Sequence, residues 1–452
     1  MISEIIFKAY DIRGIYPDEI NEVTAKKIGK AFAKFANLKR MIIGRDMRVS
    51  SPSVAEAVID GILSQGVDMV DIGMVSTPVF YHAVGADESI DGGLIVTASH
   101  NPGQYSGMKM VLGNLLPVGQ GSGMEEIKKL VLEDSFTDSE VRGTIEYRDV
   151  MQDYLDKIFS LVDINKIKPL KIVVDTGNGI NGPITQEVAG RLPQIDMLPL
   201  FFRPDGTFPN HEANPLHYET LKELQNRVIM QNAHIGFAFD GDGDRIGVVD
   251  EGGRIVPGDF LTAIIAQELL KRDEFQNKTM LADLRSSWAV KEAIEQNGGK
   301  HQECRVGHAF IKKQMRELDA VFAGELSCHF YYKNFYYVES GDLSMLLLLQ
   351  ALSESKKPFS EMVDPLKKYF QSGEINSEVE DKEGVMKKLE EKYREGAKNV
   401  SHMDGIKIEH EEYWFNVRPS NTEPVLRLNL EARTEEKMQE MKEELLAVIR
   451  NA

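Results

Sequence analysis

The sequence predicts an α/β protein in which one structural unit occurs three times before a smaller α+β domain. Two observations support this prediction. The order strand, helix, strand, helix, strand can be read three times along the first three quarters of the chain. A polar loop follows the last strand of each copy. The loop after the first copy contains Ser99, and the loops after the second and third copies contain glycine. The length of 452 residues agrees with three or four domains, at about 150 residues each.

The first copy occupies residues 41–97. Met41–Ile43 is a short apolar run, and Ser51-Pro52 is a typical start of a helix because proline fits the first helical turn. Val67–Ile72 and Leu94–Val96 are the next apolar runs, which predict strands. The loop that carries Ser99 follows directly.

The second and third copies have the same order of apolar segments. In the second copy, strands are predicted at 171–174, near 197–198 and at 235–239. In the third copy, strands are predicted at 280–282 and 320–323, with a helix around 289–294 between them. The loop 240–244 follows the second copy, and the loop 324–329 follows the third. Because open α/β sheets bind ligands at the carboxyl ends of their strands, we expect the three loops to face one cleft.

The last part of the chain departs from this pattern. It predicts an exposed amphipathic helix at 384–396, an alternating strand at 425–430 and a terminal helix from Thr434 onward. The predicted domains are 1–150, 151–252, 253–360 and 361–452.

Composition excludes several classes of function. The formal net charge of −18 argues against nucleic acid or an anionic membrane as a partner. Cys304 and Cys328 form no disulfide framework or zinc pattern, and no apolar run reaches the roughly 18 residues of a membrane span. We therefore expect a cytoplasmic protein that acts on small molecules.

The loop Asp240-Gly241-Asp242-Gly243-Asp244 places three carboxylates on alternate residues, a spacing that directs oxygens toward one hard cation. A solvated acidic turn is the alternative, and a calcium-binding helix-loop-helix is another because Glu251 is the twelfth residue from Asp240. Arg245 occupies the sixth position of that motif, where glycine is required, and the flanking segments resemble strands. The pattern favours Mg²⁺.

Ser99 lies in a loop whose composition also suits an ordinary turn. His100 and Asn101 are able to donate hydrogen bonds to phosphoryl oxygens, and Lys109 supplies a positive charge ten residues later. A phosphoserine carries about −1.5 to −2 charges at neutral pH and needs such partners. The loop is therefore a candidate phosphoserine site.

Two further loops carry polar groups. Glu325, Ser327 and His329 suit a ligand rich in hydroxyl groups, although a structural turn is the simpler interpretation of that loop alone. The segment Arg418-Pro419-Ser420-Asn421-Thr422 combines a guanidinium with two hydroxyls and an amide between prolines, as a phosphate-binding loop does. A capped turn before a strand is the alternative.

With these four loops in chain order, the sequence resembles the α-D-phosphohexomutase superfamily from end to end. Its opening, Phe7-Lys8-Ala9-Tyr10-Asp11-Ile12-Arg13-Gly14, is similar to the N-terminal signature of the bacterial phosphomannomutase/phosphoglucomutase branch. The resemblance implies four domains around a central cleft, of which the first three share a topology.

The resemblance also implies a role for each motif. Ser99 would be the phosphorylated serine, and Asp240, Asp242 and Asp244 would bind Mg²⁺ together with an oxygen of that phosphoserine. His100, Lys109 or Arg13 would assist proton transfer, and the sequence leaves open which of them is the general base. The implied substrate-binding residues are Tyr10, Arg245, Arg285, His308, Glu325, Ser327, His329, Arg418, Ser420, Asn421 and Thr422.

The implied reaction interconverts hexose 1-phosphate and hexose 6-phosphate, of mannose, glucose or both, through a bisphosphorylated sugar that must turn over. Glucose or mannose 1,6-bisphosphate would be the activator, and the protein would be a monomer or a dimer. Leu326 and Asn421 favour this branch over phosphoglucosamine mutase, which remains an alternative. A non-catalytic sugar-phosphate-binding protein and a metal-dependent phosphatase with an aspartate nucleophile are the other candidates.

Overall fold

The computed structural model describes residues 2–420 and 425–450 and separates into two compact units. Unit 1 comprises Met1–Pro257 and Ser327–Ser360, and unit 2 comprises Gly258–Leu326 and Glu361–Ala452. Among the helices that the structure describes, none has both the length and the apolar character that crossing a membrane requires.

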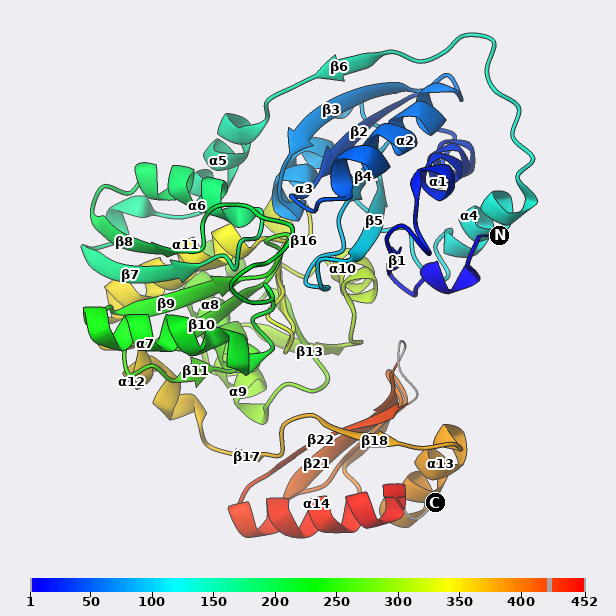
Figure 1. The fold of residues 1–452 in the computed structure, drawn as a ribbon. Coiled ribbons are helices and arrows are strands. Elements are labelled where there is room, and N and C mark those ends of the chain that lie inside the picture. The colour runs from blue at the N-terminus through cyan, green and yellow to red at the C-terminus, as the bar shows by residue number, and fades with distance from the viewer. Residues whose placement is uncertain (1, 421–424, 451–452) are drawn as a thin grey trace. The chain divides into compact units, whose positions relative to one another are not determined.

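The first sheet of unit 1 has the strand order β1-β5-β4-β2-β3-β6 (Figure 1). Its strands are β1 (Ile12–Ile15), β2 (Arg40–Arg45), β3 (Asp68–Met74), β4 (Gly92–Val96), β5 (Tyr105–Leu112) and β6 (Ile145–Tyr147). Strand β2 is parallel to β3 and β4, whereas β5 is antiparallel to both β4 and β1. The accompanying helices are α1 (Glu22–Phe35), α2 (Ser51–Leu63), α3 (Thr77–Ala86) and α4 (Met124–Glu133). Helices α1 and α2 bury their apolar faces in a core that also contains residues of β2 and β4.

The second sheet of unit 1 has the order β11-β10-β9-β7-β8. Its strands are β7 (Leu170–Asp175), β8 (Ile195–Leu200), β9 (Ile235–Phe239), β10 (Ile246–Asp250) and β11 (Ile255–Val256), and its helices are α5 (Met151–Ser160), α6 (Asn181–Gly190) and α7 (Lys222–Gln231). Strand β9 is buried along its whole length, as a continuous apolar run predicts. Unit 1 also contains the hairpin of β15 (Phe330–Tyr332) and β16 (Val338–Glu339) and the largely buried helix α11 (Gly341–Ser355), which α12 (Phe359–Val363) follows in the chain.

Unit 2 begins with three parallel strands and their helices. These elements are α8 (Gly258–Leu270), β12 (Thr279–Asp283), α9 (Trp288–Gln296), β13 (Lys300–Cys304), α10 (His308–Glu317) and β14 (Phe322–Gly324). Strand β12 lies between β13 and β14 and is parallel to both, which is the arrangement expected of strands joined by helical crossovers.

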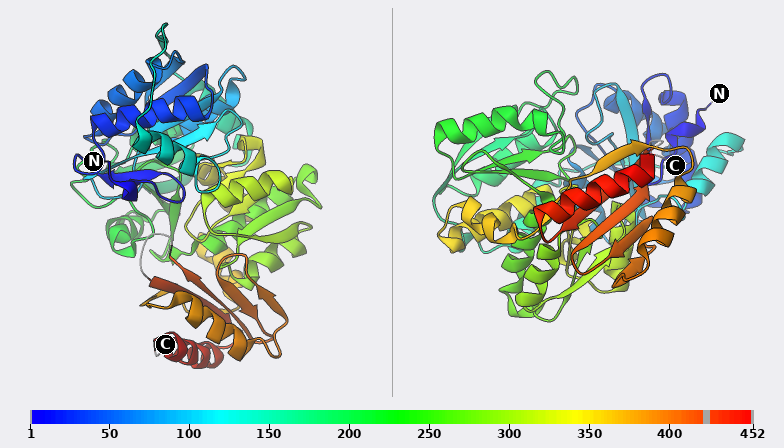
Figure 2. Two further views of the ribbon diagram at one scale, coloured as in Figure 1. Left: turned by 90° about the vertical axis from the view of Figure 1, so that its right-hand side faces the viewer. Right: turned by 90° about the horizontal axis from the view of Figure 1, so that it is seen from below.

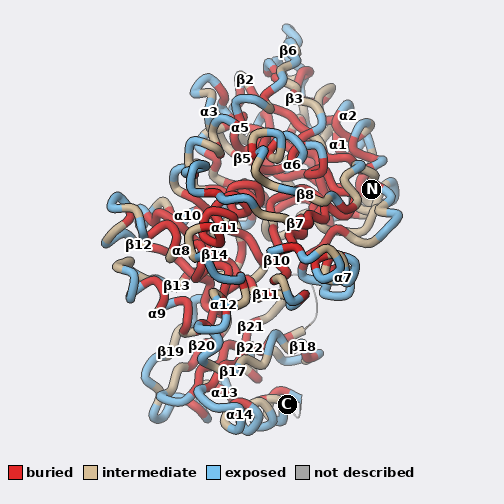
Figure 3. The backbone as a smooth tube through the Cα atoms, turned by 90° about the vertical axis from the view of Figure 1, so that its left-hand side faces the viewer, coloured by how far each residue is buried: buried red, intermediate tan, exposed pale blue. Residues whose placement is uncertain are grey.

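The rest of unit 2 is an antiparallel sheet of order β17-β22-β21-β20-β19, in which β18 also pairs with β22. Its elements are β17 (Phe370–Gln371), β18 (Ile375–Glu378), α13 (Lys382–Tyr393), β19 (Asn399–Ser401), β20 (Ile406–Glu409), β21 (Tyr413–Pro419), β22 (Val425–Ala432) and α14 (Glu435–Arg450). Helices α13 and α14 cover one face of this sheet (Figure 2) and bury Leu389, Met441 and Leu445 in a shared core. Buried residues concentrate in the strands, whereas exposed residues are frequent along α7 and α14 themselves (Figure 3).

The predicted fold class is confirmed: three mixed α/β regions precede an antiparallel C-terminal domain. The predicted repeats correspond to β2-α2-β3-α3-β4, β7-α6-β8-α7-β9 and β12-α9-β13-α10-β14. The predicted helix at 384–396 ends earlier, at Tyr393, where the chain turns toward β19. The apolar pattern did not identify β5 because Ser106, Gly107 and Lys109 interrupt the continuous apolar run that marks a buried strand.

Glu431 makes unit 2 sensitive to pH. Its Oε1 accepts hydrogen bonds from the backbone N–H of Trp288 (2.9 Å) and from Trp414 Nε1 (3.1 Å). Its Oε2 is buried and has no hydrogen-bond partner within residues 2–420 and 425–450. Burial raises the pKa of Glu431 to about 7.

We predict that Glu431→Gln raises the melting temperature at pH 8 and changes it little at pH 5. A carboxyl group whose pKa is raised by folding stabilises the folded state fully at pH values below its ordinary pKa of 4.5. This contribution is lost as the pH rises through about 7. The amide keeps the acceptor oxygen without the buried charge, so the gain at pH 8 is on the order of 2 kcal/mol. Melting curves at both pH values test this, with the exposed Glu443→Gln as control. An equal effect at pH 5 and pH 8 would contradict it.

Candidate active site

The Ser99 loop joins β4 to β5 and holds its serine in a constrained conformation. Ser99 is buried and has a φ of +51°, a left-handed backbone that side chains rarely adopt. Its Oγ donates a hydrogen bond to Asp240 Oδ2 (2.9 Å) and lies 3.2 Å from His100 Nδ1. Such local strain is typical of functional positions, and here it directs the hydroxyl at the acidic loop.

The acidic loop follows β9 and brings its three carboxylates together, with one oxygen of each within 4.8 Å of the others. Asp242 Oδ2 accepts hydrogen bonds from Lys109 Nζ (2.6 Å) and Thr77 Oγ1 (2.6 Å). Asp244 Oδ2 accepts a second bond from Lys109 Nζ (2.5 Å). Lys109 reaches both carboxylates because β5 runs back beside β4 from the Ser99 loop.

The charges of this cluster are suited to a cation. Burial, followed by the neighbouring Asp244 and Asp242, raises the pKa of Asp240 well above its ordinary value. Burial also opposes the charges of Asp242 and Asp244, yet Lys109 holds the pKa of both below the ordinary value. Oδ1 of Asp242 and Oδ1 of Asp244 are buried without hydrogen-bond partners among the described residues. Buried carboxylate oxygens without donors are the ligands that a hard divalent cation takes, so the residues present fit a metal ion.

Arg13 and His100 flank the serine. Arg13 Nη1 donates to Asn101 Oδ1 (2.5 Å), and its Nε donates to Asp11 Oδ2 (2.8 Å), which ties β1 to the Ser99 loop. Burial lowers the pKa of His100 well below its ordinary value, and the positive charges of Arg245 and Arg13 add to this effect. His100 is therefore neutral near pH 7 and has a proton-accepting nitrogen.

Arg245 and His329 extend the cluster within unit 1. Arg245 Nε donates to His329 Nε2 (3.1 Å), and a backbone bridge also joins these two residues. His329 Nδ1 lies 3.0 Å from Ser327 Oγ. Asp244 Oδ1 lies 3.3 Å from His329 Nε2, so the predicted hydroxyl-binding pair Ser327 and His329 adjoins the acidic loop.

A second group of predicted residues lies in unit 2. Glu325 Oε1 accepts a hydrogen bond from the N–H of Gly307 (3.1 Å), the residue before His308 at the start of α10. Arg285 Nη2 lies 3.9 Å from Glu325 Oε1 and donates to Asp283 Oδ2 (2.8 Å). Glu325 and Arg285 therefore neighbour each other after β14 and β12, and His308 begins the helix whose preceding residue contacts Glu325.

The predicted phosphate-binding loop lies at the end of β21. Arg418 Nη2 donates to Glu374 Oε2 (3.1 Å), and Ser420 Oγ accepts from Arg427 Nη2 (3.1 Å). Asn421 and Thr422 lie outside the described residues. Tyr10 precedes β1 in unit 1, in the segment that leads to Arg13.

Sequence reasoning missed Arg48, a fully buried arginine that organises the Ser99 loop. Its Nη1 donates to the carbonyls of Pro102 (2.7 Å) and Tyr105 (3.1 Å), and its Nη2 donates to those of Ser99 (2.8 Å) and Asn101 (2.5 Å). Asp46 Oδ2 accepts from its Nε (3.2 Å). The sequence offered only a weak signal, an Asp-x-Arg segment shortly after the first predicted strand, at the sheet edge that also carries the Ser99 loop.

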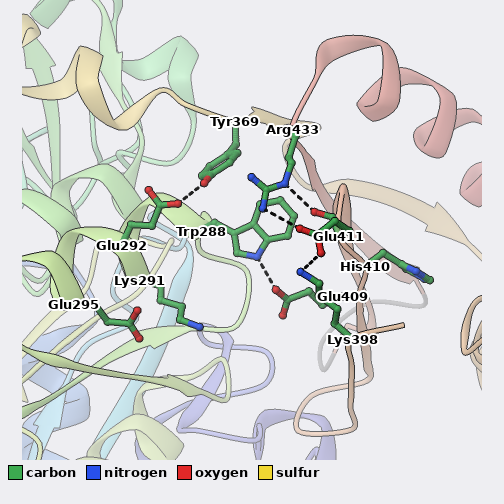
Figure 4. A pocket seen from close by; sticks show the side chains of 10 residues that line it. All are labelled: Trp288, Lys291, Glu292, Glu295, Tyr369, Lys398, Glu409, His410, Glu411 and Arg433. Atoms are coloured by element: carbon green, nitrogen blue, oxygen red, sulfur yellow. Dashed lines mark hydrogen bonds and ion pairs between the residues drawn. The ribbon is translucent and has the colours of Figure 1, made fainter. Parts of the chain in front are cut away.

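A separate pocket of about 170 Å³ in unit 2 contains none of the predicted site residues (Figure 4). Its polar groups largely satisfy one another: Trp288 Nε1 donates to Glu409 (2.9 Å), Tyr369 donates to Glu292, and Lys398 pairs with Glu411. The Ser99 and Asp240 loops therefore remain the candidate active site.

Comparisons with known proteins find one family of relatives along nearly the whole chain. Models described as phosphoglucomutase/phosphomannomutase alpha/beta/alpha domains I, II and III match residues 4–138, 152–253 and 257–369, and the model of the corresponding C-terminal domain matches residues 374–448. A phosphomannomutase of Methanocaldococcus jannaschii is 41% identical over 449 residues, which cover 98% of this chain and 97% of the relative. The phosphohexose mutases of Xanthomonas campestris are 37% identical over 94% of this chain and 95% of their own length.

A solved structure shows the same similarity in three dimensions. A phosphoglucomutase/phosphomannomutase family protein from Burkholderia thailandensis matches with a TM-score of 0.89 at 33% identity, and the match covers 99% of this chain and 97% of that chain.

Proposed function

This chain belongs to the phosphoglucomutase/phosphomannomutase family, and from that premise we propose that its Ser99 is the phosphoryl carrier of a phosphohexose mutase. The observation that supports this role is the hydrogen bond from the buried Ser99 Oγ to Asp240, beside the carboxylates that Lys109 holds. Phosphoserine 99 donates its phosphoryl group to a free hydroxyl of the sugar phosphate. The resulting bisphosphate turns over and returns its other phosphoryl group to Ser99, which leaves the isomeric product.

In this proposal, Asp240, Asp242 and Asp244 hold Mg²⁺ together with an oxygen of phosphoserine 99. When bound, the ion neutralises charge on the transferring phosphoryl group. Lys109 places a second positive charge at the same carboxylates, since its ammonium contacts both Asp242 and Asp244.

His100, Arg13 and Lys109 are the proposed proton-transfer and orienting groups. The neutral imidazole of His100 lies 3.2 Å from Ser99 Oγ, so when the hydroxyl turns from Asp240 toward it, it accepts the proton that this oxygen loses on taking up a phosphoryl group. Arg13 fixes the loop through Asn101 and adds a fixed positive charge next to the serine.

The remaining predicted residues recognise the sugar and its second phosphate. We propose that Glu325, Ser327 and His329 bind sugar hydroxyls and that Arg418 and Ser420, with Asn421 and Thr422, grip the non-reacting phosphate. Tyr10, Arg245, Arg285 and His308 complete the substrate contacts. The domains 1–150, 151–252, 253–360 and 361–452 then carry the phosphoserine, the metal, sugar recognition and phosphate binding.

Mannose and glucose phosphates are the proposed substrates, with glucose or mannose 1,6-bisphosphate as activator, in a cytoplasmic monomer or dimer. The test is turnover of glucose 1-phosphate, mannose 1-phosphate and glucosamine 1-phosphate with Mg²⁺ and bisphosphate present. Higher kcat/KM for the first two supports the proposal, and a preference for glucosamine 1-phosphate favours the phosphoglucosamine alternative. Mass spectrometry after incubation with bisphosphate locates the phosphoryl group, and phosphate release without isomerisation indicates a phosphatase.

Arg48 gives a separate prediction as a positioning residue. Lysine has a single ammonium in place of the planar fork that reaches four carbonyls, so Arg48→Lys displaces the Ser99 loop. We expect kcat to fall roughly 100-fold, the cost of a small misplacement of reacting groups, with KM nearly unchanged. The single-turnover rate of Ser99 phosphorylation by bisphosphate measures this directly.

The matched control for Arg48 is Arg142→Lys, which alters an exposed ion pair with Asp60 and leaves the loop intact. A normal phosphorylation rate in Arg48→Lys, combined with a lower melting temperature, would show that Arg48 acts only on stability.

A further inference from the structure

Three arginines of unit 2 converge on one carboxylate, Glu374. Glu374 Oε2 accepts hydrogen bonds from Arg418 Nη2 (3.1 Å) and Arg285 Nη1 (3.3 Å). Its Oε1 accepts from Arg427 Nη1 (3.1 Å). Glu374 precedes β18 and links the end of β12 to strands β21 and β22, which lie side by side in the C-terminal sheet (Figure 1).

The arrangement of these arginines is unfavourable without an anion. Arg418 and Arg427 are directly opposite each other in the antiparallel pair of β21 and β22. Like charges in that position repel each other and destabilise a sheet. A negative charge placed beside both arginines is needed to overcome this repulsion.

Glu374 supplies only part of that charge. Arg285 already forms a two-point contact with Asp283, through Nε (3.0 Å) and Nη2 (2.8 Å). Glu325 Oε1 also lies 3.9 Å from Arg285 Nη2, so Arg285 has acidic partners of its own, whereas Arg418 and Arg427 share Glu374. In addition, Arg418 Nε is buried and has no hydrogen-bond partner among the described residues. A phosphate dianion in place of Glu374 matches the two charges of Arg418 and Arg427 and has enough oxygens for all three arginines.

We propose that Glu374 is an internal competitor of the substrate's non-reacting phosphate, holding Arg285, Arg418 and Arg427 together until the phosphate displaces it. This inference rests on the proposed function, because it takes Arg418 and Ser420 as phosphate ligands. It deepens that function in one respect. The bisphosphate has to leave these arginines in order to turn over, and Glu374 takes them back as the phosphate departs.

The test compares the full-length protein with Glu374→Gln, which keeps the shape and removes the charge. Inorganic phosphate is the probe, titrated calorimetrically without added metal. Because a site that is blocked for part of the time binds with reduced apparent affinity, we expect the Kd of phosphate to fall about 10-fold in the variant. KM for hexose 1-phosphate and kcat fall together, since substrate binds more tightly and the intermediate is released more slowly. Unchanged or weaker phosphate binding overturns the inference.

Three further variants make the result unambiguous. Glu443→Gln removes one negative charge from the exposed face of α14 and is expected to bind phosphate as the unmodified protein does. Glu374→Asp keeps the charge on a shorter side chain and carries the test if the glutamine variant does not fold; its Kd is expected to fall about 3-fold, and no decrease overturns the inference.

Arg418→Gln separates this inference from the proposed function. If phosphate binding survives in Arg418→Gln, the proposed phosphate site itself is wrong. If binding is lost there while Glu374→Gln binds as the unmodified protein does, only the role of Glu374 is wrong.

Discussion

Ser99→Ala is expected to lower mutase turnover at least about 10⁴-fold, because the replacement removes the atom that carries the phosphoryl group. The variant keeps the buried acidic cluster, since the bonds from Lys109 to Asp242 and Asp244 do not involve the serine. Its melting temperature therefore changes little. Coupled turnover assays with bisphosphate, together with mass spectrometry of the protein, measure both effects.

Ser106→Ala is the matched control for Ser99→Ala. Ser106 lies in β5, is as fully buried as Ser99, and its Oγ has no hydrogen-bond partner among the described residues. This variant is expected to retain turnover and to accept one phosphoryl group per chain. Normal turnover in Ser99→Ala without phosphoserine would refute the carrier mechanism.

Asp242→Asn is expected to have the second largest effect, a fall in kcat of roughly 10²- to 10³-fold at saturating Mg²⁺. The change removes one charge from the carboxylate that contacts Lys109 and Thr77, and it leaves an amide where a cation needs an anionic oxygen. Activity measured over a series of Mg²⁺ concentrations should show that the variant needs more Mg²⁺ than the unmodified protein to reach half of its maximal rate. Isothermal titration with Mg²⁺ reports the loss of affinity without any turnover.

The control for Asp242→Asn is Asp196→Asn, an exposed aspartate of β8 that lies 3.7 Å from Lys171. Exposed ion pairs of this kind contribute little to stability, so the Mg²⁺ dependence of Asp196→Asn is expected to match that of the unmodified protein. An Asp242→Asn variant with the same Mg²⁺ dependence as Asp196→Asn would exclude Asp242 from the metal site.

The order of elements could be predicted because each of the three copies ends in a buried apolar run followed by a polar loop. Those loops are local in sequence, and their shared position after a last strand, together with the family resemblance, made Ser99, Asp240 and Glu325 candidates although two of the loops also suited ordinary turns. Lys109 was a candidate by proximity, but its contacts with Asp242 and Asp244 depend on the antiparallel pairing of β5 with β4. That pairing has no signature in the apolar pattern.

Arg48 and Glu374 were not predictable for a different reason. Each is a single charged residue whose importance comes from partners far away in the sequence: the carbonyls of residues 99–105 for Arg48, and three arginines for Glu374. A charged residue alone in a loop is usually solvated, so only the assembled fold distinguishes these two from the many others.

The pairing of Lys109 with Asp242 and Asp244 has a consequence for how the protein is made. Many small metal sites exist only when the ion is present, because their repelling ligands drive the apo chain apart. Here an ammonium group of the chain itself contacts two of the three carboxylates and offsets part of their charge, so we expect the acidic loop to assemble before a metal ion binds. If this cluster holds the proposed metal ion, metal supply is expected to change the rate of turnover and to leave the amount of folded protein unchanged.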